Sequence, residues 1–151
     1  MKLLFVPIIC GVLALLVTFL IAYNVIQEES GNKKMQDIAG HIEEGAMAFL
    51  KKEYGYLAIF IVIVFIAIAV FLNIKTAIAF LVGALFSIIA GFIGMRIAVK
   101  ANVRTTKAAE KGIKNALSVA FSGGTVMGLA VVGLGLLGVG VFCIIYDFNT
   151  E

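Results

Sequence analysis

The amino-acid sequence predicts an all-α fold, a polytopic transmembrane helix bundle of four transmembrane helices with cytoplasmic helical connections. Hydrophobic residues make up 62% of the 151 residues and charged residues only 14%, a balance far from that of a soluble domain. Four intervals contain no charged residue, and each is at least as long as the about 20 residues that a helix needs to cross the hydrocarbon core. These predicted spans are 3–27, 54–74, 76–95 and 115–146.

The first span follows Met1 and Lys2 directly, so a secretory signal is the alternative to a transmembrane helix. The apolar region of a signal is usually about 7–15 residues long, which is shorter than this run. No small-x-small cleavage site occurs near Tyr23 either. These two observations favour a transmembrane helix.

The segment before the second span predicts an amphipathic helix that runs into it. A turn-rich break at Ser30, Gly31 and Asn32 opens the segment. Apolar side chains then recur at intervals of three and four residues, namely Met35, Ile38, Ile42, Ala46 and Phe49. The second span itself is bulky and β-branched with one glycine at its edge, so we expect it to face lipid.

The polar side of this segment carries a histidine between two acids. Asp37 and Glu44 each lie about one helical turn from His41. Such a histidine suits a proton carrier or a metal ligand, whereas the simpler interpretation is a solvated helix face. We favour the solvated face, because the sequence has no second histidine to complete a ligand set.

The third and fourth spans carry small residues at helical spacing. Gly83, Ser87 and Gly91 recur every fourth residue in the third span, and Gly124 and Gly128 form a GxxxG pair in the fourth. Small residues let the backbone of a second helix approach closely. We therefore predict these five as helix-packing residues.

The connection after Met95 predicts a helix with a cationic face. Its basic residues are spaced by four and three positions, namely Lys100, Arg104, Lys107, Lys111 and Lys114. Beside them runs a stripe of small residues, namely Ala98, Ala101, Thr105, Ala108 and Gly112. One interpretation of the cations is docking to phosphate, in anionic lipid head groups or in a phosphate substrate; the other is the positive-inside bias alone.

The distribution of charge predicts the orientation. Ten of the twelve lysines and arginines lie in the first and third connections, and only Lys2 and Lys75 lie on the other side. By the positive-inside rule both longer connections are cytoplasmic, while the termini and the turn at Asn73 are external. No aromatic residue interleaves the cations from Lys100 to Lys114, so we expect no nucleic-acid partner; the expected partner is the lipid bilayer.

The two cysteines, Cys10 and Cys143, lie near the outward ends of their spans. One interpretation is a disulfide between them. The interpretation that we favour is that both cysteines act as small, buried apolar residues.

The sequence predicts no catalytic, cofactor-binding or metal-binding residue in this chain. None of the four spans contains an ionisable Asp, Glu, Lys, Arg or His, and the only adjacent acidic pairs are Glu28-Glu29 and Glu43-Glu44. Pumps, channels and membrane hydrolases usually need such groups inside the membrane, or acids gathered around a metal.

Three segments of the chain nevertheless resemble a known family. They read GNKKMQDIAGHIEEGAMAFLKKEY (31–54), TAIAFLVGALFSIIAGFIGMRIAVKANVRTT (76–106) and ALSVAFSGGTVMGLAVVGLGLLG (116–138). In order and spacing they resemble the N-terminal region of membrane-integral, ion-pumping inorganic pyrophosphatases. The joint occurrence of GAMAFL, the run 91–95 and ANVRTT makes the resemblance specific.

The resemblance implies the N-terminal four-helix portion, residues 1–151, of a larger pump that couples hydrolysis of Mg-pyrophosphate to export of H+ or Na+. It implies Mg2+ as cofactor of the complete pump, the remaining transmembrane helices as partners, a homodimer, and a location in the cell membrane. The aspartate motifs of the family are absent here, as are the positions that decide H+ against Na+ and K+ dependence. We therefore expect a fragment, a truncated reading frame or one piece of a split protein, inactive alone.

A hypothesis from another class is a free-standing, non-catalytic helical membrane scaffold or small transporter subunit. The nucleotide sequence after Glu151 discriminates the two, because only the pump continues into the aspartate motifs.

Overall fold

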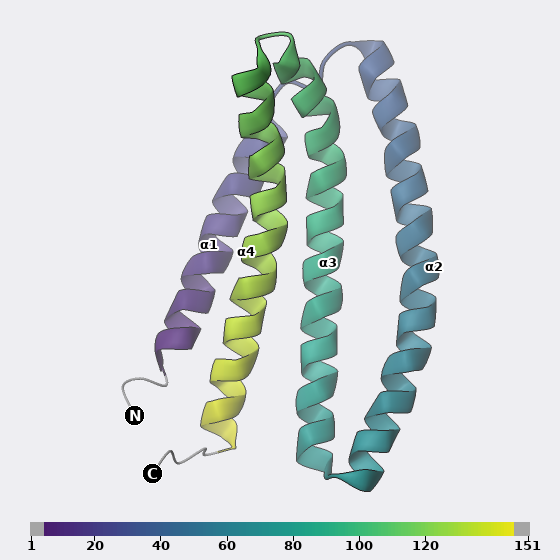
Figure 1. Ribbon diagram of the computed structural model, residues 1–151, viewed down its shortest axis with the longest axis vertical. Helices are drawn as coiled ribbons and strands as arrows, with labels where there is room; N and C mark the ends of the chain where they lie inside the picture. Colours follow the sequence, from purple (N-terminus) through teal and green to yellow (C-terminus); the bar gives the residue numbers. More distant parts are fainter. Residues whose placement is uncertain (1–4, 147–151) are drawn as a thin grey trace.

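The computed structural model of the protein describes residues 5–146 as four long helices, without a strand in that range (Figure 1). Successive helices run in opposite directions. They are α1 (Phe5–Gln27), α2 (Lys33–Phe71), α3 (Ile74–Ala109) and α4 (Ile113–Ile145). Each is long and apolar enough to cross a membrane, so the predicted all-α class and the four helices are confirmed.

Three of the helices are much longer than a bilayer requires. At about 1.5 Å per residue, α2, α3 and α4 measure about 50 to 59 Å, against about 30 Å of hydrocarbon core. In α2 and α3 the excess is where the sequence predicted helical connections, whereas α4 matches the uncharged interval 115–146 in length. Helix α2 contains the amphipathic segment and the second span without a break, and α3 continues past Met95 to Ala109. Both of these predictions are confirmed.

Short polar turns join the helices. The side chain of Asn32 accepts a hydrogen bond from the Met35 amide at 2.9 Å and begins α2, and Asn73 accepts one from the Thr76 amide at 2.8 Å and begins α3. Gly31 lies just before the first of these caps with φ 76°, a left-handed conformation that glycine adopts without strain. The break predicted at residues 30–32 is therefore present.

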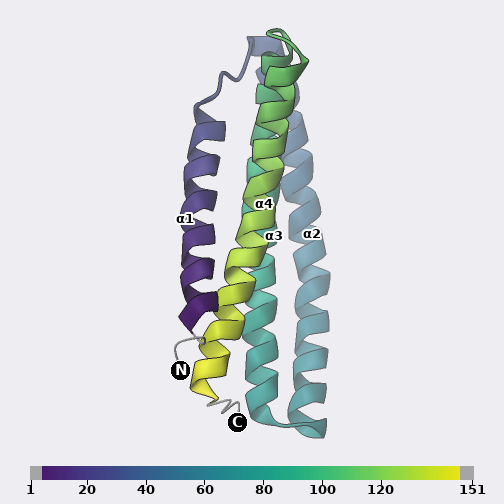
Figure 2. The same cartoon turned by 60° about the vertical axis from the view of Figure 1, so that its left-hand side comes forward.

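The four helices do not form a closed bundle. Helix α4 packs along both α1 and α3, whereas α2 packs on α3 alone among the described helices (Figures 1 and 2). The fully packed centre consists of Val25, Ile97, Ala101 and Val126, contributed by α1, α3 and α4. Helix α2 stands at one edge and α1 at the other, so α1 and α2 do not touch although they follow each other in the sequence.

The apolar half of α2 is exposed, in agreement with the expectation of a lipid-facing span. Tyr56, Ile59 and Ile63 are each more than 60% exposed, and within α2 only Leu50 and Ile61 are buried. Both cysteines are free, with Cys143 half-buried and Cys10 exposed. The expectation of a buried side chain is therefore wrong for Cys10, because that side of α1 faces away from α4. Lys2 and the first two residues of the first span lie outside the described residues.

Candidate functional site

Polar contacts gather at one end of the bundle, which we call the basic end and define by the link 28–32 and the turn 110–112. Arg104 of α3 is central there. Its Nε and Nη2 atoms donate hydrogen bonds of 3.2 and 3.0 Å to the carbonyl oxygen of Ile26, in the last turn of α1. Its Nη1 atom donates to the Lys100 carbonyl at 2.8 Å. A cation at a helix C-terminus satisfies free carbonyls and is favoured by the helix dipole, so Arg104 caps α1 from a neighbouring helix.

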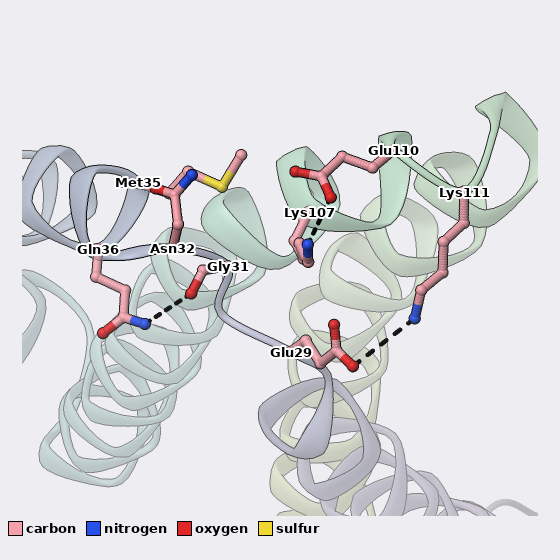
Figure 3. A network of polar contacts seen from close by, with 8 residues as sticks. All are labelled: Glu29, Gly31, Asn32, Met35, Gln36, Lys107, Glu110 and Lys111. Atoms are coloured by element: carbon pink, nitrogen blue, oxygen red, sulfur yellow. Dashed lines mark hydrogen bonds and ion pairs between the residues drawn. The ribbon is translucent and has the colours of Figure 1, made fainter.

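A polar hollow of about 260 Å³ lies beside this cap. Arg104, Lys107 and Lys111 line it together with Glu28 and Glu29, so three of the five predicted cations converge with two acids. Lys111 Nζ lies 3.9 Å from a Glu29 carboxylate oxygen, and Lys107 donates a hydrogen bond to Glu110 (Figure 3). That hydrogen bond and the negative charge of Glu110 raise the pKa of Lys107. The nearby acids offset the cations, so the hollow is not a bare anion site.

The start of α2 is held separately from this cluster. Gln36 donates a hydrogen bond of 2.9 Å to the carbonyl of Gly31, directly across the cap made by Asn32 (Figure 3). Further along the same helix, Asp37, His41 and Glu44 are exposed, and no hydrogen bond or ion pair among them occurs in the structure of residues 5–146. The solvated helix face therefore describes this trio better than a metal or proton site.

Glycines bring the helices close together, but mostly not at the predicted positions. A Cβ built on Gly11 of α1 would lie 2.8 Å from the Gly133 carbonyl oxygen of α4, and one on Gly123 would lie 2.7 Å from the Ala101 methyl. Gly94, Gly133 and Gly140 are equally tight, with nearest contacts of 2.4, 2.9 and 2.6 Å. These glycines allow the close approach of α1 and α3 to α4. Gly11 and Gly94 carry no GxxxG signal, which is why the sequence pattern missed them.

The predicted packing residues mostly face open space within the chain. A Cβ on Gly83, Gly124 or Gly128 would meet no other atom within 4 Å, and one on Gly91 would meet only the Tyr54 hydroxyl at 3.5 Å. That hydroxyl donates a hydrogen bond of 3.1 Å to the Ile88 carbonyl and joins α2 to α3. The role of these residues in contacts with helices outside the chain stays a prediction.

An apolar groove of about 490 Å³ runs between α3 and α4 in the half of the bundle away from the basic end. Gly83 and Ser87 of α3 line it opposite Gly135 and Gly138 of α4, and Phe86 touches the Gly138 position at 3.4 Å. Beyond the groove, Tyr146 donates a hydrogen bond of 2.7 Å to the Lys75 carbonyl and ties the ends of the two helices. Two of the predicted small residues therefore border a groove that no side chain of residues 5–146 fills.

The described residues hold no group of three or more His, Cys, Asp or Glu side chains that could bind a metal ion. Their acids lie at the basic end or on the exposed side of α2, apart from the helices' apolar halves. Within residues 5–146 the arrangement is therefore one of membrane helices and packing surfaces.

Comparison with known proteins gives these helices a family. Residues 12–151 match the family model described as inorganic H+ pyrophosphatase. A relative from Clostridium tetani, named as a putative K+-stimulated pyrophosphate-energized sodium pump, is 52% identical over 81% of this chain and 18% of its own length. K+-insensitive pyrophosphate-energized proton pumps from Methanosarcina mazei and Moorella thermoacetica are 43% and 47% identical over 96% and 85% of this chain.

The chain spans about a fifth of the length of these curated relatives, 22% and 19% for the two proton pumps. The family match covers all four helices except the start of α1. The chain belongs to the inorganic H+ pyrophosphatase family of membrane proteins.

Proposed function

We propose that this chain is the N-terminal four-helix portion, residues 1–151, of a pump that couples hydrolysis of inorganic pyrophosphate to movement of H+ or Na+ across a membrane. The observation that carries the proposal is the family match over residues 12–151. The relatives are named as pyrophosphate-energized pumps, one for sodium and others for protons. Because both kinds of relative are similar to this chain, the proposal includes both ions.

The proposed cofactor of the complete pump is Mg2+, whose preferred ligands are carboxylate oxygens. The described residues do not fit such a site, because they contain no cluster of three acids. Metal-assisted attack on a phosphoanhydride needs several carboxylates converging on the ion, so we assign no catalytic step to these helices. The chemistry belongs to parts of the pump outside the chain.

The proposed role of the four helices is to support the remaining transmembrane helices. Gly83 and Ser87 border the groove between α3 and α4, and Gly124 and Gly128 lie on an exposed face of α4. Glycine within a helix costs about 1 kcal/mol of stability relative to alanine in soluble hosts. No contact within residues 5–146 requires glycine at Gly83, Gly124 or Gly128. A close helix outside the chain, with Gly91 as a further contact, would explain their presence.

The proposed location is the cell membrane, with the basic end in the cytoplasm and the turn at Asn73 outside. Ten of the twelve cations lie in the first and third predicted connections, which supports this orientation through the positive-inside rule. A homodimer of the complete pump is part of the proposal through the family resemblance alone.

The test of the proposed function is pyrophosphate-driven ion uptake by inverted membrane vesicles that contain the complete reading frame. We expect acidification of the lumen or uptake of 22Na+ on addition of Mg-pyrophosphate, and neither with the nonhydrolysable imidodiphosphate. Vesicles that accumulate neither ion would contradict a pump. A reading frame that stops after Glu151 and is followed by unrelated sequence would favour the scaffold hypothesis.

The packing role has its own test in the same protein. We expect Gly83→Leu to reduce the fraction of pump that stays assembled in detergent, because a bulky side chain would obstruct the groove. The matched control is Ile63→Leu on α2, a side chain that is 61% exposed and keeps its apolar character. If the same fraction of both variants stays assembled in detergent, the small residues of α3 do not form a packing face.

A further inference from the structure

The outer surface of α2 changes character within two helical turns, at the point where its charged half meets its apolar half. A shallow hollow of about 560 Å³ lies there. Its lining residues are Ala48, Lys51, Lys52, Gly55, Tyr56 and Ile59. Two cations therefore stand at one end of the hollow and an apolar side chain at the other, with a tyrosine between them.

This hollow faces away from the rest of the chain. Leu50 and Ile61 are the buried residues of α2, and Tyr54 bonds to α3, so these three mark the side that packs on α3. In a helix with 3.6 residues per turn, Lys52 is offset from that row by about half a turn and Gly55 by about a third of a turn. Because α2 touches no described helix except α3, the hollow opens onto whatever surrounds the bundle.

The two lysines have no protein counter-ion in the described part of the chain. The ion pairs found in residues 5–146 join Lys107 to Glu110 and Lys111 to Glu29, both at the basic end. Glu44 lies one turn before Ala48 on the same row, on the side away from the apolar half. Glu53 directly follows Lys52, but it lies outside the lining of the hollow and forms no ion pair with either lysine. A negative group over the hollow, on the membrane side of the lysines, would therefore complement the site.

The open space is created by a missing side chain. A Cβ on Gly55 would meet no atom within 4 Å, so the helix backbone is accessible between Lys52 and Ile59. Tyr56 is 67% exposed, which suits the head-group level of a bilayer, where aromatic rings with a polar tip are enriched. The next exposed side chains, Ile59 and Ile63, continue the same surface into the apolar half.

We propose that this hollow binds one anionic phospholipid, with the head-group phosphate between Lys51 and Lys52, the glycerol region over Gly55 and an acyl chain along Ile59. Lysines at the end of a membrane helix reach the head groups and attract anionic lipid. A protein helix is the less suitable occupant, because it would bury two lysines that have no counter-ion in the described part of the chain. The inference rests on α2 crossing the membrane with its boundary at residues 51–56, as the proposed function has it.

The experiment measures lipid binding to the complete, delipidated pump in detergent by native mass spectrometry. Phosphatidylglycerol and phosphatidylcholine are titrated separately. We expect one high-affinity site per protomer for phosphatidylglycerol, and a lower affinity for phosphatidylcholine at that site. Lys51→Gln together with Lys52→Gln should weaken that site about 30-fold, from about fivefold per lysine near an anionic surface. Inorganic phosphate at millimolar concentration should not displace the lipid, because it lacks the acyl chain.

Two matched controls separate a built site from net charge and from shape. Lys33→Gln with Lys34→Gln removes the same charge from the exposed start of the same helix and should change the affinity less than twofold. Gly55→Leu should weaken the site without a change of charge, whereas Gly40→Leu, at another open glycine of α2, should not.

Equal losses for the two lysine pairs, or unchanged binding in Lys51→Gln with Lys52→Gln, would overturn the lipid site. A different combination of results would also overturn it: the wild-type pump binds no lipid, and the Lys51→Gln, Lys52→Gln variant fails to assemble. The occupant of the hollow would then be protein. Binding in detergent does not depend on ion pumping or on orientation, so this inference and the proposed function fail separately.

Discussion

Replacement of Gly11 by alanine tests the closest backbone approach in the structure. The new methyl carbon would lie 2.8 Å from both the Gly133 carbonyl oxygen and Leu137 Cγ, and 3.1 Å from the Leu137 amide nitrogen. Ordinary contacts of this kind measure 3.4–4 Å. Two of the three atoms belong to the backbone of α4, so a change of side-chain rotamer cannot relieve the clash. Helix α1 must move away from α4 by several tenths of an ångström.

The expected cost follows from that displacement. Overpacking of a well-packed interior typically costs about 1–3 kcal/mol, and the alanine recovers up to about 1 kcal/mol through its higher helix propensity. The matched control is Gly40→Ala on α2, where a Cβ meets no atom within 4 Å and only the propensity gain applies. We therefore expect the free energies of unfolding of the two variants to differ by about 2 kcal/mol, a factor of about 30 in the equilibrium constant.

The assay is equilibrium unfolding of the complete pump in mixed detergent and dodecyl sulfate micelles. Gly11→Ala should unfold at a lower mole fraction of dodecyl sulfate than wild type, and Gly40→Ala at the same or a higher one. Wild-type stability of Gly11→Ala would refute the close packing of α1 on α4.

Three other outcomes can be checked in the same protein. In a cysteine-free background, cysteines at Lys34 and Lys107 should be protected from impermeant thiol reagents in intact cells and one at Asn73 should be labelled; the opposite pattern would reverse the orientation. Arg104→Gln should speed proteolysis of the 28–32 link several-fold, because it removes the two hydrogen bonds to Ile26, whereas Lys114→Gln should not; equal rates would deny the cap. The 151-residue chain alone should release no phosphate from Mg-pyrophosphate above a vector-only membrane control, and should restore hydrolysis when co-expressed with the downstream helices. Phosphate release by the lone chain would return attention to the acids of α2.

Helix existence and helix length followed directly from the sequence. The thickness of the bilayer sets the minimum length of the uncharged intervals. Apolar residues spaced by three and four positions predict that the helices extend beyond those intervals. The starts of α2 and α3 fall where Asn32 and Asn73 can cap a helix. These are local properties of the chain, and for that reason they could be predicted.

Helix partnership could not be predicted in the same way. Glycines cover nearly every face of α4, so the pattern could not say that Gly133 and Gly140 meet α1 or that Gly123 meets α3. The spacing of the cations places Arg104 on a cationic face and carries no signal for its hydrogen bond to Ile26, which joins residues 78 positions apart. The predicted packing residues of α3 and α4 border surfaces that the described residues leave open, and contacts with helices outside the chain stay a prediction for them.

The arrangement of α1 against α4 has a consequence for the time course of biogenesis. Gly11 meets Gly133, so about 120 residues are synthesised between the first helix and the surface that receives it. At about 5–20 residues per second, α1 stays in the membrane for roughly 6–24 s before that surface exists. During this interval α2 and α3 can already pair as a hairpin, since they touch each other and are joined by a short turn. Helix α3 can contact the end of α1 at Val25 and Ile26 during this interval, but the face of α1 at Gly11 lacks the α4 surface that covers it in the structure.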